Sequence, residues 1–111
     1  MNTATSATQT PAPAAKAAAS SLTEDAFLGG RLKVLQPEKG FRAGIDSVFL
    51  AATIPCGPGE TLFEAGIGAG VAALCVAARV ADIHITGVEI AARYAMMAEK
   101  NFRNNGFAGN V

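Results

Sequence analysis

Three glycines at alternate positions follow a short apolar segment in LFEAGIGAGVAALCVAARV, residues 62–80. Glycine adopts backbone torsions that are closed to residues with a Cβ, and it lets a ligand approach the main chain closely. The apolar segment before Gly66 predicts a strand, and the small residues of 69–80 predict a helix. This order predicts a strand, a tight glycine turn and a helix whose amide end favours a negatively charged group.

The next segments repeat this alternation. Thr61–Ala65 and His84–Val88 are short and largely apolar, and Glu89 directly follows the second of them. A long helix is predicted over Ala91–Asn105. Strand, helix, strand, helix is the unit of a parallel sheet with right-handed crossovers. We therefore predict an α/β fold, with an incomplete parallel sheet built from a βαβα unit over residues 61–106.

A hairpin and a short helix are predicted upstream of this unit, within residues 28–55. Residues 31–36 alternate polar and apolar, a Pro-Glu-Lys-Gly turn follows, and Phe41 begins a return segment. This pattern predicts a β-hairpin. Asp46 and Ser47 are suited to cap the helix that follows, which ends at a proline and a glycine.

Residues 1–22 have a different composition from the remainder of the chain. They are mostly alanine, threonine, serine and proline, with a single charge at Lys16. Such a segment cannot bury enough apolar surface to offset its ordering entropy, which predicts a disordered tail before a domain at 23–111. The tail lacks the features of a signal peptide or a presequence, and no stretch is long enough to span a membrane.

Composition and cysteine usage exclude several classes of protein. Half of the residues are apolar, so part of the chain buries a core, while nine acidic residues balance nine basic ones and give no argument for nucleic acid or membrane. Cys56 and Cys75 are too far apart for a CxxC pair and too few for a disulfide framework or a zinc site. We predict a cytoplasmic protein without a metal site, in which the single histidine, His84, is structural.

The spacing of the glycines distinguishes two kinds of cofactor site. A dinucleotide fingerprint is GxGxxG, but here the third glycine, Gly70, comes one residue early and Val71 stands at the expected position. GIGAG, preceded by the acid Glu64 and followed by a small-residue helix, resembles the first motif of the S-adenosylmethionine methyltransferases. That cofactor has no pyrophosphate, and an acid at Glu64 suits the ammonium of its amino-acid tail.

Glu89 supports a nucleoside site of either kind. It lies at the carboxyl end of the second strand, where doubly wound folds place the residue that accepts hydrogen bonds from ribose hydroxyls. Two alternatives to a methyltransferase therefore stay open: a fragment of an NAD-dependent oxidoreductase, and a non-catalytic, degenerate nucleoside-binding domain.

The upstream segment LGGRLKVLQPEKGFRAGIDSVFLAATIP, residues 28–55, limits the resemblance to one family of methyltransferases. Together with residues 62–80 it is similar to the bacterial tRNA adenine-N6 methyltransferases, which modify an adenine beside the anticodon of a valine tRNA. The resemblance covers roughly residues 23–111 and implies a Rossmann-like fold, S-adenosylmethionine as cofactor and tRNA as substrate. The cofactor-binding residues that it implies are Glu64, Gly66, Gly68, Gly70, Glu89, Asp46 and Gly44.

The chain departs from that family in one respect. The family carries an Asn-Pro-Pro-aromatic motif that holds the target amino group and base, and this sequence contains no Asn-Pro pair. Methyl transfer to an exocyclic nitrogen depends mostly on positioning the amine in line with the methyl group. We therefore expect the N-terminal fragment of a methyltransferase, with a third strand only beginning at Val111, no catalytic residue of its own and no activity alone.

Because the expected parallel sheet is incomplete, some apolar surface is predicted to be exposed. With two parallel strands, the helix at 69–80 is expected to be partly uncovered. The hairpin carries four basic residues and one acid, which suits either an RNA backbone or, more commonly, a solvated face. The basic residues are Arg31, Lys33, Lys39 and Arg42.

Overall fold

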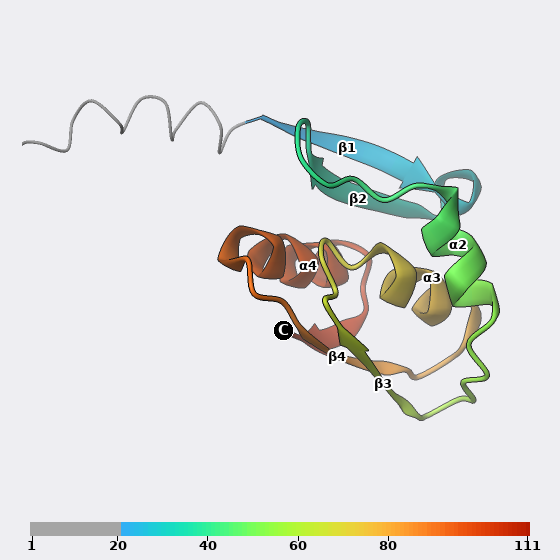
Figure 1. The fold of residues 1–111 in the computed structure, drawn as a ribbon. Coiled ribbons are helices and arrows are strands. Elements are labelled where there is room, and N and C mark those ends of the chain that lie inside the picture. The colour runs from blue at the N-terminus through green and yellow to red at the C-terminus, as the bar shows by residue number, and fades with distance from the viewer. Residues whose placement is uncertain (1–20) are drawn as a thin grey trace, which may run out of the picture.

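The computed structural model describes residues 21–111, so the predicted tail lies outside the described part except for its last two residues, and Leu22 already belongs to a strand. The elements form three layers, with an antiparallel hairpin above the helices and a parallel sheet below them (Figure 1). In chain order they are β1 (Leu22–Phe27), the 3-10 turn η2 (Leu28–Gly30), β2 (Leu32–Pro37), α2 (Ile45–Ala52), β3 (Thr61–Ala65), α3 (Val71–Arg79), β4 (His84–Val88), α4 (Ala92–Asn104) and β5 (Ala108–Asn110).

The parallel sheet has the strand order β3-β4-β5, which confirms the predicted α/β fold class. Thr61 pairs with His84 at one end of the β3-β4 ladder and Ala65 with Val88 at the other. The third strand, expected to begin at Val111, instead begins three residues earlier at Ala108. Gly106 has a φ of 78° and the N–H of the next residue bonds back to the last turn of α4, so a very short turn connects helix and strand.

The predicted hairpin was placed too far along the chain. Its first strand, near residues 31–36, is in fact the second strand, and its partner is β1, with Leu22 opposite Pro37 and Phe27 opposite Leu32. The turn lies at Leu28–Gly30, where all three residues have positive φ values of 54°, 65° and 91°. Glycines make this left-handed turn possible. β1 is exposed or half-buried along its whole length, so it lacks the apolar alternation that marks β2.

Six of the nine residues of helix α3 are buried, contrary to the expectation that it would be partly uncovered. The buried residues of α3 are Val71, Ala73, Leu74, Cys75, Val76 and Ala77. The expectation considered the sheet alone. The hairpin strand β2 contacts the side of α3 that faces away from the sheet, and α2 packs beside it, so three elements cover the helix.

Phe102 of α4 lies at the centre of the core, where only 1% of its surface is exposed. Two glycines leave room for its ring. A Cβ at Gly70 would lie 2.9 Å from the ring atom Cε1, and one at Gly109 would lie 2.6 Å from Cδ2. The aromatic ring therefore joins the glycine turn, the helix and the third strand through direct van der Waals contact.

Gly109→Ala is expected to lower the free energy of unfolding by about 1–3 kcal/mol, because the added methyl group overlaps the rigid ring of Phe102. Gly57→Ala is the matched control, since its Cβ would lie 3.6 Å from the nearest atom, an ordinary contact distance. Urea denaturation of both variants measures the difference. Equal stability of the two variants would contradict the packing described for Phe102.

Candidate functional site

The glycine turn connects β3 to α3 at the carboxyl end of the parallel sheet. Gly66, Gly68 and Gly70 all have positive φ values, of 67°, 58° and 92°. The N–H groups of Gly66 and Ile67 both donate to the carbonyl of Val88, at 2.8 and 3.0 Å. The turn is thus fastened to the end of the neighbouring strand, and it directs the first amide groups of α3 towards the sheet edge.

Glu89 holds the same turn from the other side. Its Oε1 accepts a hydrogen bond of 2.8 Å from the N–H of Gly68, and its Oε2 accepts one of 3.1 Å from the N–H of Ala91. Each carboxylate oxygen has a further lone pair available for a ligand hydroxyl. The side chain lines an open hollow of about 480 Å³ together with Gly66, Val88 and Ile90. Glu89 therefore combines a structural contact with a position suited to bind ribose.

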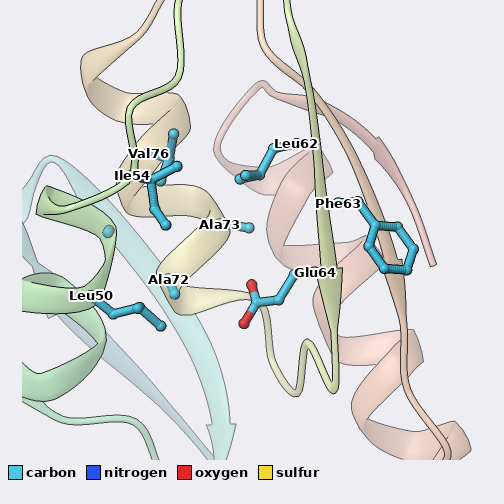
Figure 2. A pocket seen from close by; sticks show the side chains of 9 residues that line it. Leu50, Ile54, Leu62, Phe63, Glu64, Ala72, Ala73 and Val76 are labelled. Carbon is cyan, nitrogen blue, oxygen red and sulfur yellow. The ribbon is translucent and has the colours of Figure 1, made fainter.

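Glu64 differs from Glu89 because nothing described in the structure binds its carboxylate. It is half-buried, and within residues 21–111 it has no hydrogen bond or ion pair. Figure 2 shows its carboxylate pointing from β3 towards the start of α3, while the neighbouring Phe63 points the opposite way. Burial raises the pKa of Glu64 from 4.5 to about 7. A cation beside it would offset this cost and restore the charged form.

A cavity of about 210 Å³ brings most of the predicted site residues together. Its walls come from the end of β2, from the linker after it, from α2 and from the glycine turn. The lining residues predicted from the sequence are Asp46, Glu64, Gly66 and Gly68. Two carboxyl groups and the main chain of the turn thus face one space, a combination suited to a ligand with an ammonium group.

A smaller apolar cavity of about 90 Å³ adjoins this space and shares Leu50, Glu64 and Ala72 with it (Figure 2). Apart from Phe63 and Glu64 itself, the lining residues are aliphatic, and this apolar surrounding is the reason for the desolvation of the Glu64 carboxyl group.

The predicted helix cap at Asp46 is wrong. The N-cap of α2 is Gly44, which has an extended backbone, and no side chain caps the helix. Asp46 is two residues after this N-cap, in the first turn of the helix, where a negative charge is favourable beside the free amide groups. Its carboxylate instead lines the 210 Å³ cavity, whereas Gly44 is beside Asp46 and does not line it.

Two of the four basic residues of the hairpin region are engaged within the chain. Arg31 donates to the carbonyl of Ala78 at the end of α3, at 2.7 Å, and Arg42 forms an ion pair of 3.0 Å with Asp25. Lys33 and Lys39 are exposed. Asp25 offsets the charge of Arg42, so the net positive charge of this surface is smaller than these four basic residues and one acid indicate.

Asn101 was not predicted from the sequence as a site residue. It is completely buried, and its Nδ2 donates a hydrogen bond of 2.9 Å to the carbonyl of Ala69 in the glycine turn. A signal was present, because a polar residue occupies a position one turn after the buried Met97 on the apolar face of its helix.

Over residues 21–111 no group of three metal-ligating side chains occurs, and none of the helices there is long and apolar enough to cross a membrane.

Comparison with known proteins extends these observations. No protein-family model matches the chain. It is 32% identical over 77 residues to a tRNA1(Val) (adenine(37)-N6)-methyltransferase of Flavobacteriaceae bacterium (strain 3519-10), and the match covers 69% of this chain and 33% of that relative. The predicted resemblance to the methyltransferases is confirmed in sequence.

The fold is similar to that of a SAM dependent methyltransferase from Agrobacterium tumefaciens. The TM-score is 0.53 and the sequence identity 16%, over 81% of this chain and 32% of that protein. The chain thus has a partial Rossmann-like methyltransferase fold and spans about a third of the length of either relative.

Glu64→Gln is expected to stabilise the chain at pH 8 by about 1–2 kcal/mol and to change its stability little at pH 5. The folded pKa of about 7 is above the ordinary value of 4.5. The unfolded chain therefore loses this proton first, and the wild type loses stability as the pH rises through that window. Urea denaturation at both pH values measures the effect.

Glu38→Gln is the control, because Glu38 is exposed and lies outside the cavity. A stability difference between Glu64→Gln and the wild type that is the same at pH 5 and pH 8 would contradict the burial of this carboxyl group.

Proposed function

We propose that this chain is the cofactor-binding part of an S-adenosylmethionine-dependent methyltransferase. The observation that carries the proposal is the carboxylate of Glu64, which faces the glycine turn without a partner among the described residues. A half-buried acid with a raised pKa costs stability unless a ligand cation compensates it. The ammonium of the cofactor's methionine portion has the required charge.

The remaining predicted site residues fit the other parts of this cofactor. The glycine turn lets the methionine portion approach the main chain, and the amide end of α3 favours its carboxylate. Glu89 has lone pairs left for the ribose hydroxyls, beside a hollow that Ile90 borders with an apolar side chain. Asp46 and Gly44 lie at the start of α2, where Asp46 adds a second acid to the cavity. The bound cofactor supplies an electrophilic methyl group.

A pyrophosphate suits this site less well than a methionine tail. An NAD-type cofactor places two negative charges on the glycine turn. Here the space beside the turn holds two carboxyl groups, those of Asp46 and Glu64. Repulsion between like charges therefore disfavours the oxidoreductase alternative.

The amino group of a tRNA adenine is the acceptor that we propose for the whole enzyme. Support comes from the relative in which a tRNA adenine is the named substrate, and from the resemblance of residues 28–55 to that family. The chain has no Asn-Pro pair to position an exocyclic amine, so we propose that these 111 residues do not methylate RNA alone. A tRNA substrate and two free cysteines, Cys56 and Cys75, also suit the cytoplasm.

The chain is expected to bind S-adenosylmethionine at pH 7.5 and to bind NAD far more weakly. Glu64→Gln should lower the affinity for S-adenosylmethionine about ten- to hundred-fold, because one charge-assisted hydrogen bond is lost. Lowering the pH from 7.5 to 6 should weaken binding by the wild type, whose Glu64 has a pKa of about 7 and must lose its proton to bind the ammonium. The variant should show no such loss.

Isothermal titration calorimetry measures these affinities, with Glu38→Gln as the control that should bind like the wild type. Preference for NAD over S-adenosylmethionine would reject the proposed cofactor. Equal affinities of Glu64→Gln and the wild type would reject the role of Glu64.

A longer protein that joins this chain to an Asn-Pro-Pro-aromatic segment is expected to methylate a valine tRNA transcript at an adenine beside the anticodon. Nuclease digestion and mass spectrometry would locate the modified nucleotide. A transcript with guanine in place of that adenine is the control and should gain no methyl group there. Methylation of another nucleotide, or of protein instead, would reject the proposed acceptor while leaving the cofactor site intact.

A further inference from the structure

We propose that Asn101 is a positioning residue that fixes the glycine turn in its ligand-binding form and couples it to the hairpin. The inference rests on the proposed function, in which the glycine turn contacts the ligand. Asn101 has no exposed surface, and its side chain makes three hydrogen bonds to main-chain groups. Nδ2 donates to the carbonyls of Ala69 and Leu35, at 2.9 and 3.0 Å, and Oδ1 accepts from the N–H of Leu35 at 2.8 Å.

The contact with Ala69 determines the orientation of one peptide group in the turn. Ala69 stands between Gly68 and Gly70, two residues with left-handed torsions that leave the backbone between them many alternative conformations. The carbonyl of Ala69 accepts from Asn101, and the N–H of the same peptide group, on Gly70, donates to the carbonyl of Ile67 at 3.0 Å. The peptide group is therefore held at both of its polar atoms.

Loss of this contact would leave a buried acceptor unpaired. Ala69 is itself buried, and a buried carbonyl without a donor is unfavourable enough to make the peptide group turn towards water. Such a rotation changes the path of the main chain between Gly68 and α3, which is the surface proposed to meet the methionine portion. Asn101 thus acts on the ligand through the turn, without touching the ligand itself.

The contact with Leu35 connects this turn to a separate layer of the fold. β2 lies on the opposite side of the helices from the parallel sheet (Figure 1). One amide side chain therefore links the hairpin, α4 and the glycine turn. A shift of β2 that pulls Leu35 away from Asn101 also disturbs the bond to Ala69, so the position of the hairpin and the shape of the turn are coupled.

Asn105, the C-cap residue of α4, provides a matched comparison one helical turn after Asn101. Its Oδ1 accepts from the N–H of Lys33 at 3.0 Å and its Nδ2 donates to the carbonyl of Lys33 at 2.9 Å. Asn105 thus makes the same pair of hydrogen bonds to the main chain of β2 as Asn101, but two residues earlier along the strand. The additional bond of Asn105 goes to the carbonyl of Asn101 in its own helix, whereas that of Asn101 goes to the glycine turn.

The test compares Asn101→Ala with Asn105→Ala in the whole chain. Both variants should lose stability, because each releases a strand. Isothermal titration with S-adenosylmethionine should give an affinity at least ten-fold lower for Asn101→Ala and within about two-fold of the wild type for Asn105→Ala. Amide hydrogen exchange at Gly70 should become faster in Asn101→Ala alone. Equal effects of the two variants on affinity and on exchange would overturn the proposal.

A second variant and a second measurement cover the cases in which Asn101→Ala does not fold or the wild type does not bind. If Asn101→Ala is unfolded, Asn101→Ser retains a hydroxyl that is too short to bridge Leu35 and Ala69, and it should show the same selective effects in smaller size. If the wild type binds no S-adenosylmethionine, the proposed function is wrong, and the exchange rate of Gly70 alone then decides whether Asn101 positions the turn.

Discussion

The contact between the ring of Phe102 and the backbone of Gly70 and Gly109 is the constraint on which the other features depend. Because neither glycine has a side chain, α4 packs directly against both the glycine turn and β5. Close packing of this kind transmits displacement, since no void can absorb it. The next residue towards the N-terminus, Asn101, adds a directional hydrogen bond to the same turn. Phe102 and Asn101 of α4 therefore fix a turn that lies more than thirty residues before them in the sequence.

The two acids of the site have opposite environments, which gives them different tasks. Both oxygens of Glu89 accept hydrogen bonds from main-chain N–H groups, so its charge is compensated in the absence of a ligand. Glu64 faces aliphatic side chains, and its raised pKa reflects that absence of compensation. One acid is thus part of the framework of the turn, and the other is the one that we propose to meet the cation of the ligand. This division suits a ligand with a ribose at one end and an ammonium at the other.

The sequence predicted those features that local patterns determine. Short apolar segments that alternate with longer helical segments predicted the βαβα order, and the spacing of the glycines predicted the turn. Both patterns depend on residues that are close in the sequence. Predictions failed for features that contacts beyond the local sequence pattern determine. β1 carries no apolar alternation and forms because β2 supplies its partner. Asp46 is not the cap because Gly44 occupies the N-cap position of α2. Asn101 was missed because its partners, Leu35 and Ala69, are far from it in the sequence.

The position of the site also follows from the alternation along β3. Successive side chains of a strand point to opposite faces, so Glu64 faces the helices and Phe63 faces away from them (Figure 2). Within residues 21–111 no helix covers the face that Phe63 and Val88 share, and these side chains are 61% and 50% exposed. Parallel sheets are generally covered on both faces. The proposed cofactor cavity depends only on the helical face, where α2, α3 and the glycine turn meet, so its geometry is set by elements that are all present in this chain.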